Sequence, residues 1–159
     1  MEELKLPLKA NKKELYKCLT EQIKSLVGNE KNIIANMANV SAAIRQSFDF
    51  LWVGFYLCEN DSELVLGPFQ GSIACMRIKF GQGVCGMAWK EQRTVIVDDV
   101  DKFPGHIACS SASKSEIVVP LFKHKKIFAV LDIDSDKLNA FDDIDKTALE
   151  NMMKIIIKD

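Results

Sequence analysis

The spacing of apolar residues changes near residue 50, and this change constrains the fold more than any other feature of the chain. Between about Asn11 and Phe48, apolar side chains recur every three or four residues, which predicts two helices separated at Gly28. From Phe50 onward the period shortens, and β-branched and aromatic residues become frequent. We therefore expect a pair of helices followed by a sheet.

The expected strands are short, and several of them are joined as hairpins. They are residues 51–57, 64–66, 73–78, 94–97, 117–122 and 127–133. Residues 81–86 (GQGVCG) are expected to form a tight loop that leads into a short helix over 87–90, and a last helix begins near Asp142. This order predicts an α+β domain in which an antiparallel sheet carries helices on one face.

The length of 159 residues fits one domain with a substantial core. We expect residues 1–49 to form the N-terminal helices and residues 50–159 to form the sheet and a pocket. The polar segment 98–115 is longer than an ordinary connection, which indicates a lid, a binding loop or a disordered segment. This loop contains Cys109.

The charge balance argues against several classes of partner. The chain has 21 basic and 22 acidic residues, and this net charge of −1 gives no field that would attract nucleic acid or an anionic membrane. No run approaches the ~20 apolar residues of a membrane span, and no signal peptide is visible, so we expect a cytoplasmic protein with reduced thiols. Five cysteines are an odd number, which also argues against a secreted disulfide framework.

Three of the cysteines lie within 35 residues of one another, namely Cys75, Cys85 and Cys109. Three interpretations compete. The cysteines could be inert core residues, they could bind structural zinc together with His106, or they could be redox-active. Structural zinc sites usually contain pairs of ligands two to four residues apart, and only His106 and Cys109 are that close.

The redox interpretation has a physical basis at each of the three positions. Cys85 is expected just before a short helix, whose free N–H groups would stabilise a thiolate. Cys109 lies on the long loop, from which it could approach both a substrate and a partner thiol. Cys75 is expected on a strand, which would give a fixed partner for a disulfide.

Three acidic residues are expected to meet at the end of the last hairpin. Asp132 and Asp134 alternate along one strand and so share a face, and Glu116 begins the preceding strand. A turn centred on residues 124–125 places Glu116 opposite approximately residue 133. Clustered carboxylates would raise at least one pKa, supply a proton donor and bind an ammonium group. The alternative is a strand end with solvated acids.

Trp52 and Tyr56 lie four residues apart on one face of the first strand. Two aromatic side chains in this arrangement are typical of core packing. They could instead form a wall against the methyl group of a ligand. The sequence leaves both interpretations open.

Five segments of the chain match the pattern of a known enzyme family. They are WVGFYL, LVLGPFQGSIAC, GQGVCG, FPGHIACSSASKSEIVVPL and AVLDIDS. Together they resemble the free methionine-(R)-sulfoxide reductases, a GAF-domain family, from about residue 52 to residue 149. The resemblance implies a GAF-like central antiparallel sheet, with the N-terminal and C-terminal helices packed on one face and a long active-site loop.

The same resemblance implies reduction of free L-methionine (R)-S-oxide by thiolate attack, sulfenic acid formation and disulfide resolution. Cys109 would be the nucleophile, and Cys75 and Cys85 would resolve the oxidised product. The implied substrate-binding residues are Glu116, Asp132, Asp134, Trp52 and Tyr56. A thioredoxin-type reductant and a homodimer are expected, without a metal or other cofactor. The rival hypothesis is a non-catalytic GAF module that senses a small molecule or the redox state.

Overall fold

A computed structural model describes residues 3–107 and 110–157. In these residues six strands form one sheet in the order β3-β2-β1-β6-β5-β4, and every neighbouring pair is antiparallel. The strands are β1 (Trp52–Cys58), β2 (Glu63–Gln70), β3 (Arg77–Lys79), β4 (Val95–Val97), β5 (Ser115–Lys123) and β6 (Lys126–Ser135). The helices are α1 (Lys12–Val27), α2 (Ile33–Ser47), α3 (Gly83–Glu91) and α4 (Asp143–Ile156). The predicted α+β class is confirmed.

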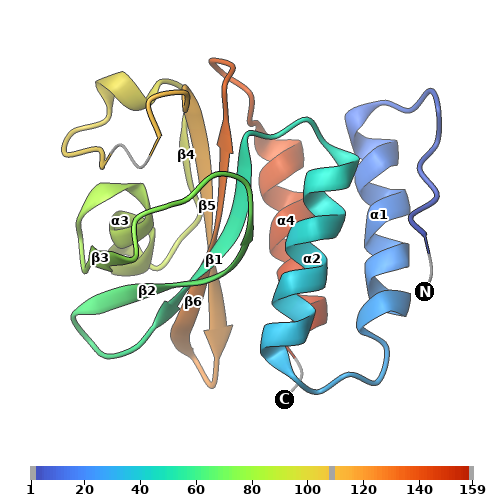
Figure 1. Cartoon of the computed structure of the whole chain (residues 1–159), viewed down its shortest axis with the longest axis horizontal. Coiled ribbons are helices and arrows are strands. Elements are labelled where there is room, and N and C mark those ends of the chain that lie inside the picture. The colour runs from blue at the N-terminus through green and yellow to red at the C-terminus, as the bar shows by residue number, and fades with distance from the viewer. Residues whose placement is uncertain (1–2, 108–109, 158–159) are drawn as a thin grey trace.

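The two faces of the sheet carry different numbers of helices. Helices α2 and α4 cover one face, and α1 packs on their outer side (Figure 1). Helix α3 and the described residues between β4 and β5 (98–107 and 110–114) lie on the opposite face, and they include a short 3-10 turn (Val100–Lys102). The expectation that the terminal helices share one face is therefore confirmed, and α3 stands apart from them.

Alternation along β1 separates two hydrophobic cores. Val53 and Phe55 point into the larger core between the sheet and the three terminal helices, whereas Trp52 and Tyr56 point into the smaller core beside α3. Burial of both faces explains why this strand is apolar at nearly every position. The smaller core forms the floor of a pocket.

The α1–α4 contact contains a buried carboxylate. Asp145 of α4 is fully buried, accepts a hydrogen bond from the Tyr16 hydroxyl at 2.8 Å and pairs with Lys12 Nζ at 2.6 Å. Asp142 caps the first turn of α4 by accepting from the backbone N–H groups of residues 144 and 145. These contacts join the N-terminal helix to the C-terminal one.

The predicted end of the second strand at Gly67 is wrong. Strand β2 continues through Gly67 and Pro68 as far as Gln70. The register between β1 and β2 shifts between Gly54 and Tyr56, and Pro68 lies in the irregular stretch that this shift creates. A proline is tolerated there because its missing N–H breaks no regular ladder bond.

Two further boundaries differ from those expected, and both affect cysteines. The strand expected over residues 73–78 is shortened to β3, so Cys75 lies in an irregular segment before the strand. The segment expected as a loop over residues 81–86 already contains the first turn of α3, so Cys85 is a helical residue. Local glycines signalled the turn correctly, but they did not show that the helix begins at Gly83.

The last hairpin forms as predicted, with a register one residue away from the simple count. His124 and Lys125 make the turn with φ values of 48° and 64°, which match the twist of the two strands. A β-bulge between Leu121 and Phe122 adds one residue to β6, so Glu116 pairs with Asp134. None of the helices in the described part of the chain is long and apolar enough to cross a membrane.

Candidate active site

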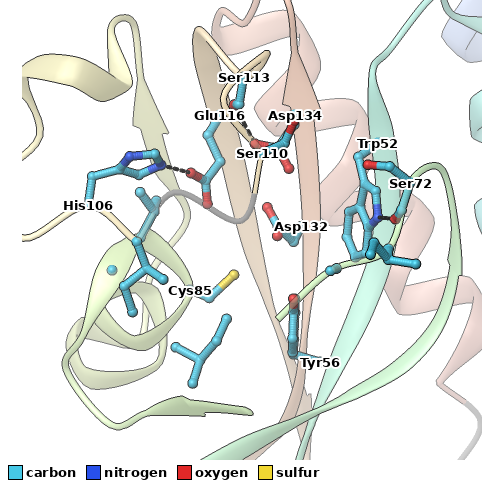
Figure 2. Close-up of a pocket in the computed structure, with 16 residues that line it drawn as sticks. Trp52, Tyr56, Ser72, Cys85, His106, Ser110, Ser113, Glu116, Asp132 and Asp134 are labelled. Atoms are coloured by element: carbon cyan, nitrogen blue, oxygen red, sulfur yellow. Dashed lines mark hydrogen bonds and ion pairs between the residues drawn. The ribbon is translucent and has the colours of Figure 1, made fainter. Parts of the chain in front are cut away.

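A pocket lies on the sheet face that α3 covers, between β1, β6, β5, α3 and the segment that precedes β5 (Figure 2). Its cavity has a volume of about 40 Å³. Most of the residues predicted for a functional site line it: Trp52, Tyr56, Cys85, Glu116, Asp132 and Asp134. Residues far apart in the sequence therefore meet at one end of the central strands.

The three predicted carboxylates form a cluster in this pocket. Glu116 of β5 pairs with Asp134 of β6, and Asp132 lies two residues earlier on the same face of β6. Glu116 and Asp132 are only 6% and 7% exposed. The solvated strand end that the sequence left open is therefore excluded for these two residues.

Burial determines the protonation of this cluster. Removal from water raises the pKa of Glu116 well above its ordinary value, and the nearby charge of Asp134 adds to that effect. The pKa of Asp132 is raised in the same way, first by burial and then by Glu116. These carboxyl groups therefore hold protons at a higher pH than exposed ones, as a proton donor requires.

Cys85 belongs to the same cluster, but as a thiol rather than a thiolate. Its side chain is 3% exposed and points from the first turn of α3 toward Glu116 and Asp132 (Figure 2). Burial raises the pKa of the Cys85 thiol well above its ordinary value, and the negative charge of Asp132 raises it further. The expected stabilisation of a thiolate at a helix N-terminus is therefore overcome at this position.

Of the other two predicted cysteines, only Cys75 lies within the described residues. Cys75 is half-buried and disulfide-bonded, and its carbonyl oxygen accepts a hydrogen bond from the Tyr56 hydroxyl at 3.0 Å. Cys109 lies outside the described residues. Cys18, Cys58 and Cys85 are free thiols. Cys18 and Cys58 do not line this pocket.

Two aromatic rings form one wall of the pocket. The rings of Trp52 and Tyr56 are stacked with centroids 6.0 Å apart, and Trp52 Nε1 donates to the Ser72 carbonyl oxygen at 3.0 Å. Gly54 stands between them on β1, where a Cβ atom would collide with the Trp52 ring and with Phe69. The absence of a side chain at Gly54 therefore permits the position of the Trp52 ring.

Two polar side chains next to the carboxylates were not predicted to act with them. His106 Nε2 lies 3.6 Å from Glu116 Oε2, and Ser113 Oγ donates to Asp134 Oδ1 at 2.6 Å. Both precede β5 on the long polar segment. The unusual length of this segment indicated that it could have a function. The sequence of a polar loop does not show which of its side chains point into a pocket.

The pocket also gathers side chains that can ligate a metal, although not the set considered from the sequence. Among the described residues, Cys85, Glu116 and Asp132 place one ligand atom each within 4.8 Å of one another. The set considered from the sequence comprises Cys75, Cys85, Cys109 and His106, of which Cys109 lies outside the described residues.

The fold and the pocket define the class of protein. The GAF-domain family model matches residues 36–156, and the chain belongs to the GAF-domain family. "GAF domain-containing protein A" of Dictyostelium discoideum is 58% identical over 148 residues, which cover 93% of this chain and 94% of that protein.

The resemblance to the free methionine-(R)-sulfoxide reductases is confirmed by two further comparisons. The "Free methionine-R-sulfoxide reductase" of Escherichia coli is 46% identical over 144 residues, 90% of this chain and 87% of that protein. The crystal structure of free methionine-R-sulfoxide reductase from Neisseria meningitidis in complex with its substrate is 48% identical, with a TM-score of 0.95. That alignment covers 98% of this chain and 93% of the other.

Proposed function

We propose that this protein is an oxidoreductase that reduces free L-methionine (R)-S-oxide to methionine. The observation that carries the proposal is a buried cluster of carboxyl groups facing an aromatic wall in one pocket. The described residues that line this pocket include three acidic residues and no lysine or arginine. The similarity to the reductases of Escherichia coli and Neisseria meningitidis supports the same conclusion.

Each part of the substrate has a matching group in the pocket. The ammonium group is attracted by the carboxylates of Asp132 and Asp134, since a buried negative site favours a cation. The methyl group packs against the Trp52 ring. A site that is built to pair charged groups rejects an analogue that lacks them, because its polar groups are then left without partners.

The reaction we propose begins with attack by the Cys109 thiolate on the sulfoxide sulfur. The carboxylic acid of Glu116, whose pKa is raised by burial, protonates the sulfoxide oxygen. Methionine leaves with the sulfur reduced, and the oxygen remains on Cys109 as a sulfenic acid. A second thiol then displaces water from the sulfenic acid and forms a disulfide.

We assign the resolving role to Cys75 in preference to Cys85. Cys75 is disulfide-bonded in this structure, so a second sulfur can reach it. Cys85 is a free thiol whose raised pKa makes it a poor nucleophile. Cys85 instead packs beside the carboxyl groups and takes part in binding.

Single-turnover reduction in each cysteine variant tests these roles. Cys109→Ser should release no methionine, whereas Cys75→Ser should release one equivalent and then fail to turn over with thioredoxin. Cys58→Ser, outside the pocket, is the matched control and should behave as the wild type. If Cys85→Ser alone abolished the first release, the assignment would be wrong. Absence of any turnover with dithiothreitol would favour the sensor hypothesis.

The remaining expectations concern the domain organisation, the cellular location, the oligomeric state and the reductant of the enzyme. We propose that residues 1–159 act as one GAF domain in the cytoplasm, as a homodimer that thioredoxin recycles. Exposed apolar side chains on the N-terminal helices, Leu26 and Ile34, support pairing through this region. Light scattering on the purified protein measures the dimer, and turnover with thioredoxin in place of dithiothreitol measures the recycling.

A further inference from the structure

One thiol and two carboxyl groups point at one place in the pocket. The ligand atoms of Cys85, Glu116 and Asp132 all lie within 4.8 Å of one another, and all three residues are buried. Figure 2 shows the sulfur of Cys85 pointing from α3 toward the two carboxyl groups on the sheet. One sulfur and two oxygens in such an arrangement can surround a single ion.

A second observation indicates that this place is made for a cation. Asp132 Oδ1 is fully buried and has no hydrogen-bond partner among the described residues. Burying a carboxylate oxygen without a hydrogen-bond donor carries a free-energy cost, which a bound cation would offset. No lysine or arginine is present among the described residues that line the pocket to compensate for it.

We propose that the reduced protein binds one thiophilic divalent cation, of which Zn²⁺ is the representative, through Cys85, Glu116 and Asp132. The cation acts as a reversible inhibitor and is not a resident cofactor. Binding itself is independent of the proposed reductase activity, and only the inhibition rests on that activity. Because the ion and the substrate's ammonium group would both use Asp132, methionine sulfoxide competes with the ion.

The donor set explains the choice of ion. Zn²⁺ combines thiolate, imidazole and carboxylate ligands in a tetrahedron, whereas Mg²⁺ requires oxygen ligands in an octahedron. His106 Nε2 lies 3.6 Å from Glu116 Oε2 but does not belong to the set of ligand atoms that lie within 4.8 Å of one another, so a water molecule would supply the fourth ligand. Coordination requires the Cys85 thiol to lose its proton, which passes to solvent.

Direct binding measurements test the proposal without relying on turnover. The fully reduced protein is titrated with Zn²⁺ against a chromogenic chelator, and one equivalent per chain should bind. With Co²⁺ as the probe, a thiolate-to-metal charge-transfer band should appear. Both signals should weaken at least ~10-fold in Cys85→Ser, and Glu116→Gln should weaken Zn²⁺ binding while the volume of the side chain is kept. Mg²⁺ should not compete.

Matched controls make the outcome decisive. Cys58→Ser removes a free thiol outside the pocket and should leave Zn²⁺ affinity unchanged. If Cys75→Ser weakened binding as strongly as Cys85→Ser, the ion would use a different sulfur and the proposal would be overturned. Unchanged Zn²⁺ affinity in both Cys85→Ser and Glu116→Gln would also overturn it. An inactive enzyme that still bound Zn²⁺ through Cys85 would contradict the reductase proposal alone.

Discussion

Glu116 and Asp132 illustrate how the chemistry of a residue depends on its surroundings. The sequence placed both on neighbouring strands near the same end, which was enough to predict that their carboxyl groups would meet. It did not show whether that end would be exposed. The segment that precedes β5 and helix α3 close over it, and burial then raises the pKa of both groups.

Replacing Glu116 with glutamine is expected to lower kcat by about 100-fold, because a positioned proton donor typically contributes 10²–10⁴-fold. Steady-state reduction of free methionine (R)-sulfoxide with dithiothreitol measures the effect. Asp136→Asn, an exposed substitution four residues beyond Asp132, serves as the control and should retain wild-type kcat. A Glu116→Gln variant with undiminished kcat would remove Glu116 from the proton transfer.

Replacing Asp132 with asparagine is expected to stabilise the fold increasingly as the pH rises. A carboxyl group whose folded pKa is raised contributes stability below its unfolded pKa, near 4, and this contribution is lost as the pH rises through the folded pKa. Each unit of pKa difference corresponds to about 1.4 kcal/mol. Thermal unfolding at pH 5 and pH 9 should show a stability difference between the variant and the wild type that is larger at pH 9. A difference that is the same at both pH values would contradict the raised pKa of Asp132.

At the scale of elements, periodicity predicted the helices and the hairpin strands well. The two N-terminal helices and the last hairpin follow directly from residue spacing, because one buried face imposes a regular apolar repeat. Irregular positions were not predictable in this way. The β-bulge at Leu121 and the shift near Gly54 depend on how neighbouring strands pair, and neither has a strong local signal.

Replacing Gly54 with alanine is expected to raise KM about 10-fold for free methionine sulfoxide. The added Cβ would displace the Trp52 ring from the pocket wall, because it would overlap that ring and the Cβ of Phe69. The control is Gly67→Ala on β2, where a Cβ meets Phe55 and Leu57 on the other side of the sheet. It should cost stability but leave KM unchanged. Equal KM values for the two variants would refute this role of Gly54.

Replacing Asp142 with alanine is expected to destabilise the protein by about 1 kcal/mol, the usual effect of losing an N-cap. Chemical denaturation measures the change in the free energy of unfolding. Asp143→Ala, at the next position but without a capping bond among the described contacts, is the comparison and should change stability less. Catalysis should be unaffected in both variants because α4 lies on the far face of the sheet.

For the molecule as a whole, the division of the sheet into two faces separates stability from function. The larger core between the sheet and α1, α2 and α4 contains no residue proposed for catalysis or substrate binding. The smaller core beside α3 includes Cys85 and the aromatic wall. Substitutions that impair activity should therefore be separable from those that impair folding.

The acidic lining of the pocket is also expected to make the enzyme selective for the free amino acid. N-acetylation removes the ammonium charge of methionine (R)-sulfoxide, and the carboxylates that pair with that charge are left unsatisfied. We expect kcat/KM to fall by at least ~10³-fold for the N-acetyl substrate, measured with dithiothreitol as reductant. Comparable kcat/KM values for the two substrates would show that the ammonium group is not recognised.

The sequence by itself determined the class of fold and the identity of the reactive groups. Periodicity fixes helices and strands because it follows from burial of one face, and thiols and carboxyls carry their chemistry wherever they lie. Only the tertiary structure decided the state of those groups. Cys85, expected as an activated thiolate, is a buried thiol because α3 begins earlier and packs it against carboxyl groups. Desolvation depends on what covers a side chain, and residues distant in sequence supply that cover.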